Sequence, residues 1–218
     1  MKVKMIGHSP YPLVTLVNAF RTCWHSESKS DSSGWELGER DGELIKKAIE
    51  HGHESPLEHV SFTFEFVVSR VTQTQLIRHR IASYSIESMR YVQPDDFHIP
   101  ESISEDPELA TLYLKHCRDS FAMYDRLLKM GVKKEDARYL LPMSTNGKIV
   151  MTMNLREIRH FIAERTCRHA QDEIRDLALT IKDHVARTHP LFVYRCEKAY
   201  RCPEAKLSAC GICLGVRK

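Results

Sequence analysis

Hydrophobic and polar residues alternate most regularly in the segment SFTFEFVVSR, residues 61–70. Apolar side chains occupy every second position from Phe62 to Val68, and polar residues lie between the first of them. A period of two residues predicts a β-strand with one face in the core. A shorter apolar segment, KIVMTMN, predicts a second strand, and Asn154 at its end suits the N-cap of a following helix.

Apolar residues recur at helical spacing in several longer stretches. One helix is expected to stop at Gly52, because glycine suits a helix end. Another is expected to begin at Pro107, which suits a first helical turn, and to end before Gly131. The predicted helices cover residues 15–24, 42–52, 71–80, 107–130 and 155–185.

Helices and strands therefore alternate along a chain of 218 residues, a length that suits one domain with a sizeable core. The pattern predicts a single-domain α+β fold in which a small, largely antiparallel sheet is flanked by long helices. Residues 26–34, SESKSDSSG, are polar and end in glycine, which is typical of a loop.

The chain carries a formal net charge of +3 and has a pI near 8.4. So mild an excess of positive charge argues against nucleic acid as a partner and favours small anionic ligands that meet local clusters of basic residues. No apolar stretch approaches the length that spans a bilayer, and the start MKVKMIGHSP lacks the hydrophobic core of a secretion signal. We expect a cytoplasmic protein that binds neither membrane nor nucleic acid.

Three consecutive ionisable residues, Arg78, His79 and Arg80, are followed after seven residues by Ser88. Three neighbouring side chains cannot share one face of a helix or strand, so at least one must point inward or toward a ligand, where it needs a partner. Helical spacing would place Gln75 beside Arg78 and His79. Guanidinium and hydroxyl groups suit phosphate oxygens, so the cluster indicates an anion site; the alternative is a solvated basic patch.

A second cluster of basic residues lies in the predicted helix of residues 155–185. Arg156 and His160, four positions apart, share one face, whereas Arg165 falls near the packing side beside Phe161. Because arginine does not lose its charge, Arg165 must find an anion or several acceptors; the alternative is a structural arginine that reaches the rim or pairs with a carboxylate. The apolar stripe of this helix is formed by Leu155, Ile158 and Ile162.

Together these segments resemble the flavin-dependent thymidylate synthases. The hallmark of that family is RHR, then seven residues, then serine, as at residues 78–80 and Ser88. A second family segment has N-x-R, then Asn or His, then Arg, then H-A-Q-x-E-I, and this chain matches it from Asn154 to Ile174. The similarity is dense over 51–91, good over 136–175, thin over 1–50 and absent beyond about residue 196.

The resemblance implies reductive methylation of dUMP to dTMP. Methylenetetrahydrofolate would donate the one-carbon unit, and FAD reduced by NADPH would supply the hydride. Family members are homotetramers with active sites at subunit interfaces, so the resemblance implies that assembly as well. Two other functions stay open: a non-catalytic nucleotide- or RNA-binding module, and an enzyme of the same fold that acts on another pyrimidine nucleotide.

The resemblance also assigns roles to residues. Arg165 would be the catalytic residue, because a guanidinium at the uracil ring stabilises negative charge there and raises the nucleophilicity of C5. Contacts to the flavin would come from His53, Ser55, Arg78, His79, Arg80, Asn154, Arg156 and His160. Contacts to dUMP would come from Gln75, Arg78, Glu87, Ser88, Met89, Arg90, Arg138 and Arg165.

One position departs from the family pattern. Many members carry Asn-Glu after the aromatic residue that follows RHR, whereas this chain has Ser85, Ile86 and Glu87 after Tyr84. Ile86 cannot make the polar contacts of a carboxylate, and Glu87 lies one position further along the chain.

Seven cysteines, an odd number, argue against a complete set of disulfides. Three of them are scattered and are expected to be reduced: Cys23, Cys117 and Cys167. The other four lie in a predicted tail, residues 196–218, that follows an enzyme domain of residues 1–195: Cys196, Cys202, Cys210 and Cys213.

A zinc knuckle in this tail is physically allowed, but intervals of five and seven residues between its first three cysteines are loose for a zinc ribbon. Reduced or redox-labile thiols are expected there instead. His53 and His59, six positions apart, lack a third ligand at useful spacing. The sequence therefore predicts no bound metal.

Overall fold

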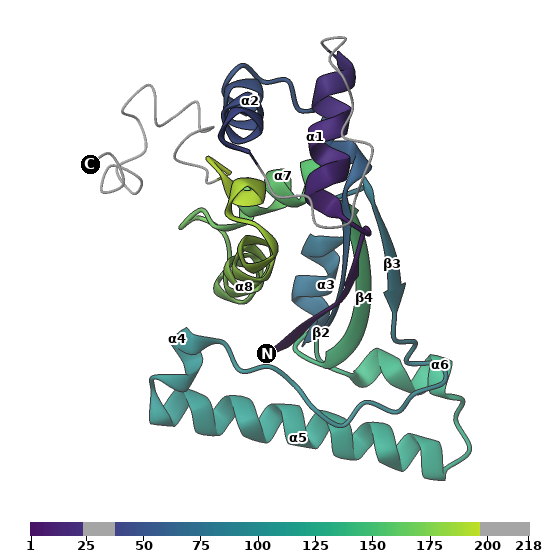
Figure 1. Cartoon of the computed structure of the whole chain (residues 1–218). Helices are drawn as coiled ribbons and strands as arrows, with labels where there is room; N and C mark the ends of the chain where they lie inside the picture. Colours follow the sequence, from purple (N-terminus) through teal and green to yellow (C-terminus); the bar gives the residue numbers. More distant parts are fainter. Residues whose placement is uncertain (24–37, 197–218) are drawn as a thin grey trace. The chain divides into compact units, whose positions relative to one another are not determined.

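The computed structural model describes residues 1–23 and 38–196, whose helices and strands are drawn in Figure 1. Four strands form one antiparallel sheet in the order β1-β2-β4-β3. The strands are β1 Lys2–His8, β2 Ser61–Ser69, β3 Ala82–Ile86 and β4 Asn146–Asn154. This small antiparallel sheet, combined with helices, confirms the predicted α+β class.

Eight α-helices and three short 3-10 helices occur within the described residues. The α-helices are α1 Pro12–Cys23, α2 Glu39–Glu50, α3 Arg70–Leu76, α4 Glu101–Ser104, α5 Pro107–Lys129, α6 Lys134–Ala137, α7 Leu155–Arg165 and α8 Asp172–Thr188. The 3-10 helices are η1 Ser55–His59, η2 Arg138–Leu140 and η3 Pro190–Val193.

Contacts between Cα atoms divide the chain into two compact units. The first unit consists of Met1–Lys2, Glu65–Arg78 and Tyr84–Val150. The second unit consists of the described residues within Val3–Phe64, His79–Ser83 and Met151–Lys218. The predicted boundary between an enzyme domain and a tail at residue 196 stays a prediction, because residues 197–218 lie outside the described part of the chain.

The first unit contains α5, the long teal helix of Figure 1. Asp106 caps its start, since one carboxylate oxygen accepts hydrogen bonds from the amides of Glu108 and Leu109. Pro107 occupies the first turn, and Gly131 follows the end of the helix with a φ of 87°, a conformation that favours glycine. These local signals explain why the helix predicted over residues 107–130 is confirmed.

The second unit buries one side of each of its four longer helices. The ring of Phe62 in β2 packs edge-on against that of Phe192, with 5.8 Å between ring centroids. Burying each large apolar side chain contributes about 1.5–3 kcal/mol. The buried apolar residues on these helices are Leu16, Val17, Phe20, Ile45, Ala48, Ile49, Leu155, Ile158, Phe161, Ile162, Ala163, Ile174, Leu177, Ala178, Ile181 and Val185.

The helix predicted over residues 155–185 is interrupted, so that prediction was wrong in its continuity. α7 ends at Arg165, and the hydroxyl of Thr166 donates a hydrogen bond to the carbonyl of Ile162. Gln171 then has extended backbone angles and leads into α8, whose first turn is acidic and therefore suits a helix N-terminus. The short polar connection leaves Arg165 at the C-terminal end of α7.

The helix predicted over residues 71–80 is also shorter than expected. α3 ends at Leu76, whose carbonyl accepts a hydrogen bond from the hydroxyl of Tyr84, although the amide of Arg78 still bonds the carbonyl of Gln75. His79 and Arg80 therefore lie beyond the helix rather than on its surface. The strands β1 and β3 are absent from the predicted elements, although burial alternates along both.

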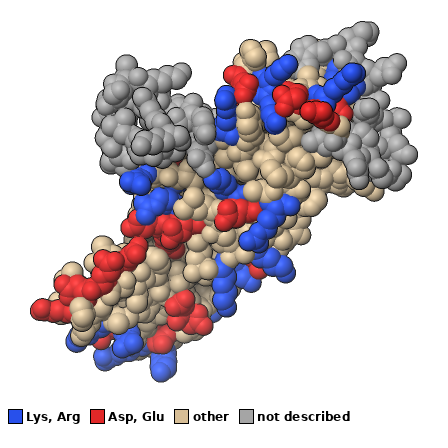
Figure 2. All heavy atoms as spheres, turned by 60° about the vertical axis from the view of Figure 1, so that its left-hand side comes forward, with Lys and Arg blue, Asp and Glu red and all other residues tan. Residues whose placement is uncertain are grey.

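Charged side chains of both signs occur near one another on the face of the molecule shown in Figure 2. Within residues 1–23 and 38–196, no helix is both long enough and apolar enough to cross a membrane.

Replacing Asn154 by alanine should lower the free energy of unfolding by about 1 kcal/mol, because the α7 cap is lost. In the structure the side-chain oxygen of Asn154 accepts a hydrogen bond of 2.9 Å from the amide of Glu157. Urea unfolding followed by circular dichroism measures the change, with Asn154→Ser as the matched control that keeps a capping oxygen. Equal losses for the two variants would contradict this role for the cap.

Candidate active site

His79 is buried, with 6% of its surface exposed, whereas Arg78 and Arg80 on either side are exposed. The prediction that at least one of the three side chains points inward is therefore confirmed. The Nδ1 atom of His79 lies 3.0 Å from Oε1 of Glu157, and its Nε2 atom accepts a hydrogen bond of 3.1 Å from Nε of Arg165. A single buried imidazole thus links the RHR motif to both ends of α7.

The surroundings of His79 favour its neutral form. Burial is the main cause that lowers the pKa of His79 below 6.5, and the charge of Arg165 and the nearby His160 lower it further. The hydrogen bond to Glu157 acts in the opposite direction. Two rings of α7 also pack against His79: the ring centroids of His160 and Phe161 lie 5.6 Å and 5.1 Å from that of His79.

A cavity of about 400 Å³ opens beside this cluster in the second unit. Two of its lining residues, Arg156 and Glu58, form an ion pair, and hydrogen bonding to Glu58 raises the pKa of Arg156. His160 is exposed on the same face of α7, as the spacing of the two residues predicted. The cavity is lined by Glu54, Glu58, Ile81, Asn154, Arg156, Glu157 and His160.

Arg159 is a fully buried arginine of α7 that is absent from the predicted site residues. Its Nη1 atom donates a hydrogen bond of 3.0 Å to the carbonyl of Phe192, and its Nε atom lies 4.0 Å from a carboxylate oxygen of Glu54. The available signal was its position next to Ile158 and three residues before Ile162, on the apolar side of the helix. These contacts make Arg159 a support for the wall of the cavity rather than a ligand contact.

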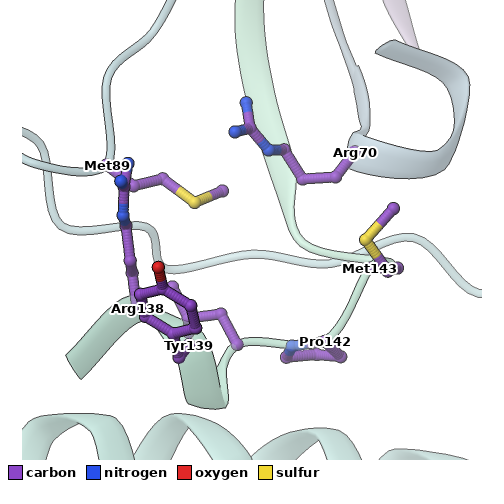
Figure 3. Close-up of a pocket in the computed structure, with 7 residues that line it drawn as sticks. Arg70, Met89, Arg138, Tyr139, Pro142 and Met143 are labelled. Atoms are coloured by element: carbon purple, nitrogen blue, oxygen red, sulfur yellow. The ribbon is translucent and has the colours of Figure 1, made fainter. Parts of the chain in front are cut away.

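The first unit has a separate cavity of about 270 Å³, shown in Figure 3. Arg70 and Arg138 extend into it from different elements, and none of the seven lining residues is acidic. Burial lowers the pKa of Arg70, and the charge of Arg138 lowers it further, which indicates two cations facing one space. The lining residues are Arg70, Met89, Arg138, Tyr139, Leu141, Pro142 and Met143.

Two predicted dUMP contacts, Met89 and Arg138, therefore lie together at this cavity, and Arg70 is a residue that the predicted set lacks. Arg70 is the first residue of α3 and directly follows Ser69, the last residue of the strand β2. The sequence signal that could have marked it was a charged residue directly after this largely apolar strand. Arg90 is exposed and forms an ion pair of 2.9 Å with Glu135.

The remaining predicted dUMP contacts of the first unit do not line this cavity. Gln75 is half-buried on α3, and the Ser88 hydroxyl accepts a hydrogen bond of 3.3 Å from the amide of Arg90. The carboxylate of Glu87 accepts a hydrogen bond of 3.2 Å from the amide of Lys148 in β4.

Of the predicted flavin contacts in the second unit, Asn154, Arg156 and His160 line its cavity. His53 and Ser55 are exposed and do not line it, although Glu54 between them does. The imidazole of His53 stacks on that of His51, with 6.5 Å between ring centroids.

His79, Glu157 and His160 also bring three potential metal-ligating atoms within 4.8 Å of one another. The Nδ1 atom of His79 is already engaged with Glu157, and a cation there would lie near the guanidinium of Arg165, which disfavours metal binding. Cys196 is buried, as are Cys117 and Cys167, whereas Cys202, Cys210 and Cys213 lie outside the described residues.

Comparison with known proteins decides the family. The profile of the thymidylate synthase complementing protein family matches residues 4–191. A flavin-dependent thymidylate synthase of Thermococcus onnurineus is 39% identical, with 97% of this chain and 92% of the relative covered. Another, from Nitratidesulfovibrio vulgaris, is 37% identical, with 96% and 94% covered.

This chain belongs to the flavin-dependent thymidylate synthase family. Among solved structures, a UMP/dUMP methylase, PolB, from Streptomyces cacaoi, bound with 5-Br dUMP, is similar with a TM-score of 0.80 and 27% sequence identity. The similarity covers 88% of this chain and 92% of that chain. The match confirms the family predicted from the RHR motif.

The departure from the family pattern at Ile86 has a structural counterpart. Ile86 is the last residue of β3 and is half-buried. The amide of Glu87 donates to the carbonyl of Lys148, and its carboxylate accepts from the amide of the same residue, so Glu87 is tied to the backbone of β4. In this thymidylate synthase family member, the neighbouring carboxylate therefore has a contact of its own.

Acid should destabilise the protein through His79. In the unfolded chain His79 binds a proton as pH falls through about 6.5, whereas in the folded protein its pKa is lowered and it binds the proton only at lower pH. The unfolded state therefore gains more protons than the folded state in this range, and the free energy of unfolding decreases. Urea unfolding between about pH 7.5 and 5.5 should show a shallower pH dependence for His79→Gln than for the original protein. His189, whose pKa is also lowered by burial, contributes equally to both proteins. Identical slopes would contradict the neutral, buried His79.

Proposed function

We propose that this protein converts dUMP to dTMP, and that Arg165 is its catalytic residue. The observation that carries the assignment is the hydrogen bond of Arg165 to the buried His79 of the RHR motif, in a chain of this enzyme family. Arg165 is half-buried, so its guanidinium is held by the protein and still reachable by a ligand. Placed at the uracil ring, this fixed positive charge stabilises the negative charge that develops as C5 becomes nucleophilic.

The phosphate of dUMP binds at the cavity of the first unit. Arg70 and Arg138 face this space without an acidic lining residue, and a phosphate provides the negative charge that would lower the electrostatic cost of placing two guanidinium groups there. Met89 supplies an apolar wall. Ser88 and Arg90, which lie in the adjoining turn, are further contacts of the nucleotide, together with Gln75, Arg78 and Glu87.

The residues at the cavity of the second unit fit a flavin. Its volume of about 400 Å³ lies within the range of ligand pockets, and it combines an apolar wall at Ile81 with amide, imidazole and guanidinium groups. Arg156 is exposed and paired with Glu58, so it can exchange one anionic partner for another. Asn154, Arg156 and His160 hold FAD here, with His53, Ser55 and the RHR residues as further contacts.

When bound, FAD supplies the hydride that completes the methyl group, after reduction by NADPH, and methylenetetrahydrofolate supplies the carbon. The protein binds and orients these molecules, and Arg165 polarises the pyrimidine. The cytoplasm is the proposed place of this reaction.

The assembly we propose is a homotetramer in which more than one chain contributes to each active site. Exposed apolar residues along and just beyond α5 support it, because large side chains of this kind commonly mark protein interfaces. The exposed residues are Leu109, Leu112, Met123 and Met130.

A second candidate substrate is UMP. The similar solved structure is named for both UMP and dUMP, and this chain has Ile86 where many family members carry a carboxylate. A non-catalytic nucleotide- or RNA-binding module has less support, because the matched relatives are named as enzymes.

Arg165→Ala should reduce turnover about 10²- to 10³-fold, the cost typical of removing one electrostatic contact to a reacting group. Release of tritium from 5-tritiated dUMP measures the reaction, because methylation at C5 displaces that hydrogen. Release should require methylenetetrahydrofolate and NADPH, and the same assay with 5-tritiated UMP tests the second candidate.

The matched control for this assay is Arg187→Ala, which removes an exposed arginine of α8 in the same unit. Full activity of Arg165→Ala would disprove its catalytic role. No release from either nucleotide by folded, flavin-loaded protein would disprove the proposed function.

Arg70→Ala and Arg138→Ala should each weaken dUMP binding about ten- to a hundredfold, as expected for a lost hydrogen bond between charged groups. Binding of deoxyuridine, which lacks the phosphate, should change little. Isothermal titration calorimetry measures both affinities, with Arg118→Ala on the exposed surface of α5 as the control. Equal losses for dUMP and deoxyuridine would contradict a phosphate site here.

A further inference from the structure

We propose that Glu157 is a positioning residue that holds His79 in the tautomer protonated on Nδ1, so that Nε2 can accept the hydrogen bond of Arg165. The three side chains form one chain of contacts, Glu157 to His79 at 3.0 Å and His79 to Arg165 at 3.1 Å. The expected effect of Glu157 on dUMP binding rests on the proposed role of Arg165. The hydrogen bonds that link the three side chains do not depend on that proposal.

The direction of the two hydrogen bonds follows from the chemistry of the groups. A guanidinium group only donates, so Nε2 of His79 must offer its lone pair to Arg165. In a neutral imidazole the other nitrogen then carries the proton, and Nδ1 donates it to the carboxylate of Glu157. If the proton moved to Nε2, two N–H groups would face each other and the bond to Arg165 would be lost.

Glu157 has little reason to occupy this place for the sake of the helix alone. It is the third residue of α7, three positions after the N-cap Asn154, where a glutamate commonly reaches back to the N-cap amide in a capping box. Its Oε1 atom instead lies against His79, and only 8% of its side chain is exposed. Burying a carboxylate is costly unless it is hydrogen-bonded, which points to a role at the imidazole.

The geometry also distinguishes this role from metal binding. His160 brings a third potential ligand within 4.8 Å, but Arg165 occupies the far side of His79 as a donor. A carboxylate that fixes the tautomer and orientation of an imidazole, which in turn contacts a third functional group, is a recognised arrangement in active sites.

The decisive measurement is the ¹⁵N NMR spectrum of the ring nitrogens in the full chain labelled at histidine, with the His79 signals assigned by their loss in His79→Gln. In the original protein, Nδ1 should be protonated and Nε2 should not. Glu157→Gln retains an acceptor and should retain this tautomer. Glu157→Leu removes the acceptor and should shift the proton toward Nε2.

Arg165→Ala is the matched test of what sets the tautomer. Because Glu157 remains, His79 should stay protonated on Nδ1. A tautomer that changes in Arg165→Ala, or one that is unchanged in Glu157→Leu, would overturn the proposal. If Glu157→Leu fails to fold, a loss of the Nδ1 proton in Glu157→Gln overturns it, and its retention supports it.

A double-mutant cycle on dUMP affinity tests whether Glu157 acts on dUMP binding through Arg165. Glu157→Leu alone should weaken dUMP binding about tenfold, as for loss of a hydrogen bond to a charged group, but should have little further effect when Arg165 is already alanine. Additive effects in the two backgrounds would indicate a structural role for Glu157 and count against the proposal.

If Arg165→Ala leaves dUMP affinity unchanged, the proposed contact of Arg165 with the base fails. The NMR result then decides by itself whether Glu157 controls His79. The failure of the proposed function and the failure of this inference are therefore distinguishable.

Discussion

The buried imidazole of His79 imposes the constraint on which the candidate active site depends. An imidazole with so little exposure needs partners at both nitrogens, because an unmade hydrogen bond in the interior costs about 1–3 kcal/mol. Glu157 near the start of α7 and Arg165 at its end supply these partners. The backbone that follows α3 is thereby fixed against α7, and the two flanking arginines are directed outward.

The length of α7 is suited to this contact. Positions 157 and 165 are eight residues apart, and position 161 between them places the ring of Phe161 against His79. Had the helix continued past Arg165 as predicted, this arginine would lie inside a helix rather than in its last turn. The Asn154 cap sets the start, and the polar segment after Thr166 sets the end.

Much of the fold could be predicted because its signals are local. The alternation that begins at Phe62 defines β2, and Asn154 caps α7 by a contact to an amide three residues away. The end of α3 and the contact of α7 with His79 could not be predicted in this way. The first involves Tyr84, which bonds a carbonyl eight residues earlier, and the second joins residues far apart in the sequence.

The candidate site was predictable where a motif marks it and not where burial decides the role. Arg165 and His79 follow from the family pattern, whereas no motif marks Glu157, and Arg159 is marked only by its position on the apolar side of the helix. Their burial arises from partners on other elements, and a single sequence does not reveal those partners. Arg70 could not be predicted for the same reason, because its role depends on the cavity that it shares with Arg138.

The two cavities also differ in how their charge is balanced, and this difference supports the assignment of their ligands. Around the cavity of the first unit, two guanidinium groups have no acidic neighbour among the lining residues, so a dianionic phosphate lowers their electrostatic energy. Around that of the second unit, three glutamates accompany Arg156, and one of them pairs with it. An uncharged ring system with several polar atoms suits this lining, in which three carboxylates accompany one guanidinium group. The same two cavities with the ligands reversed would leave two arginines uncompensated and bring a phosphate next to three carboxylates, which Coulomb repulsion disfavours.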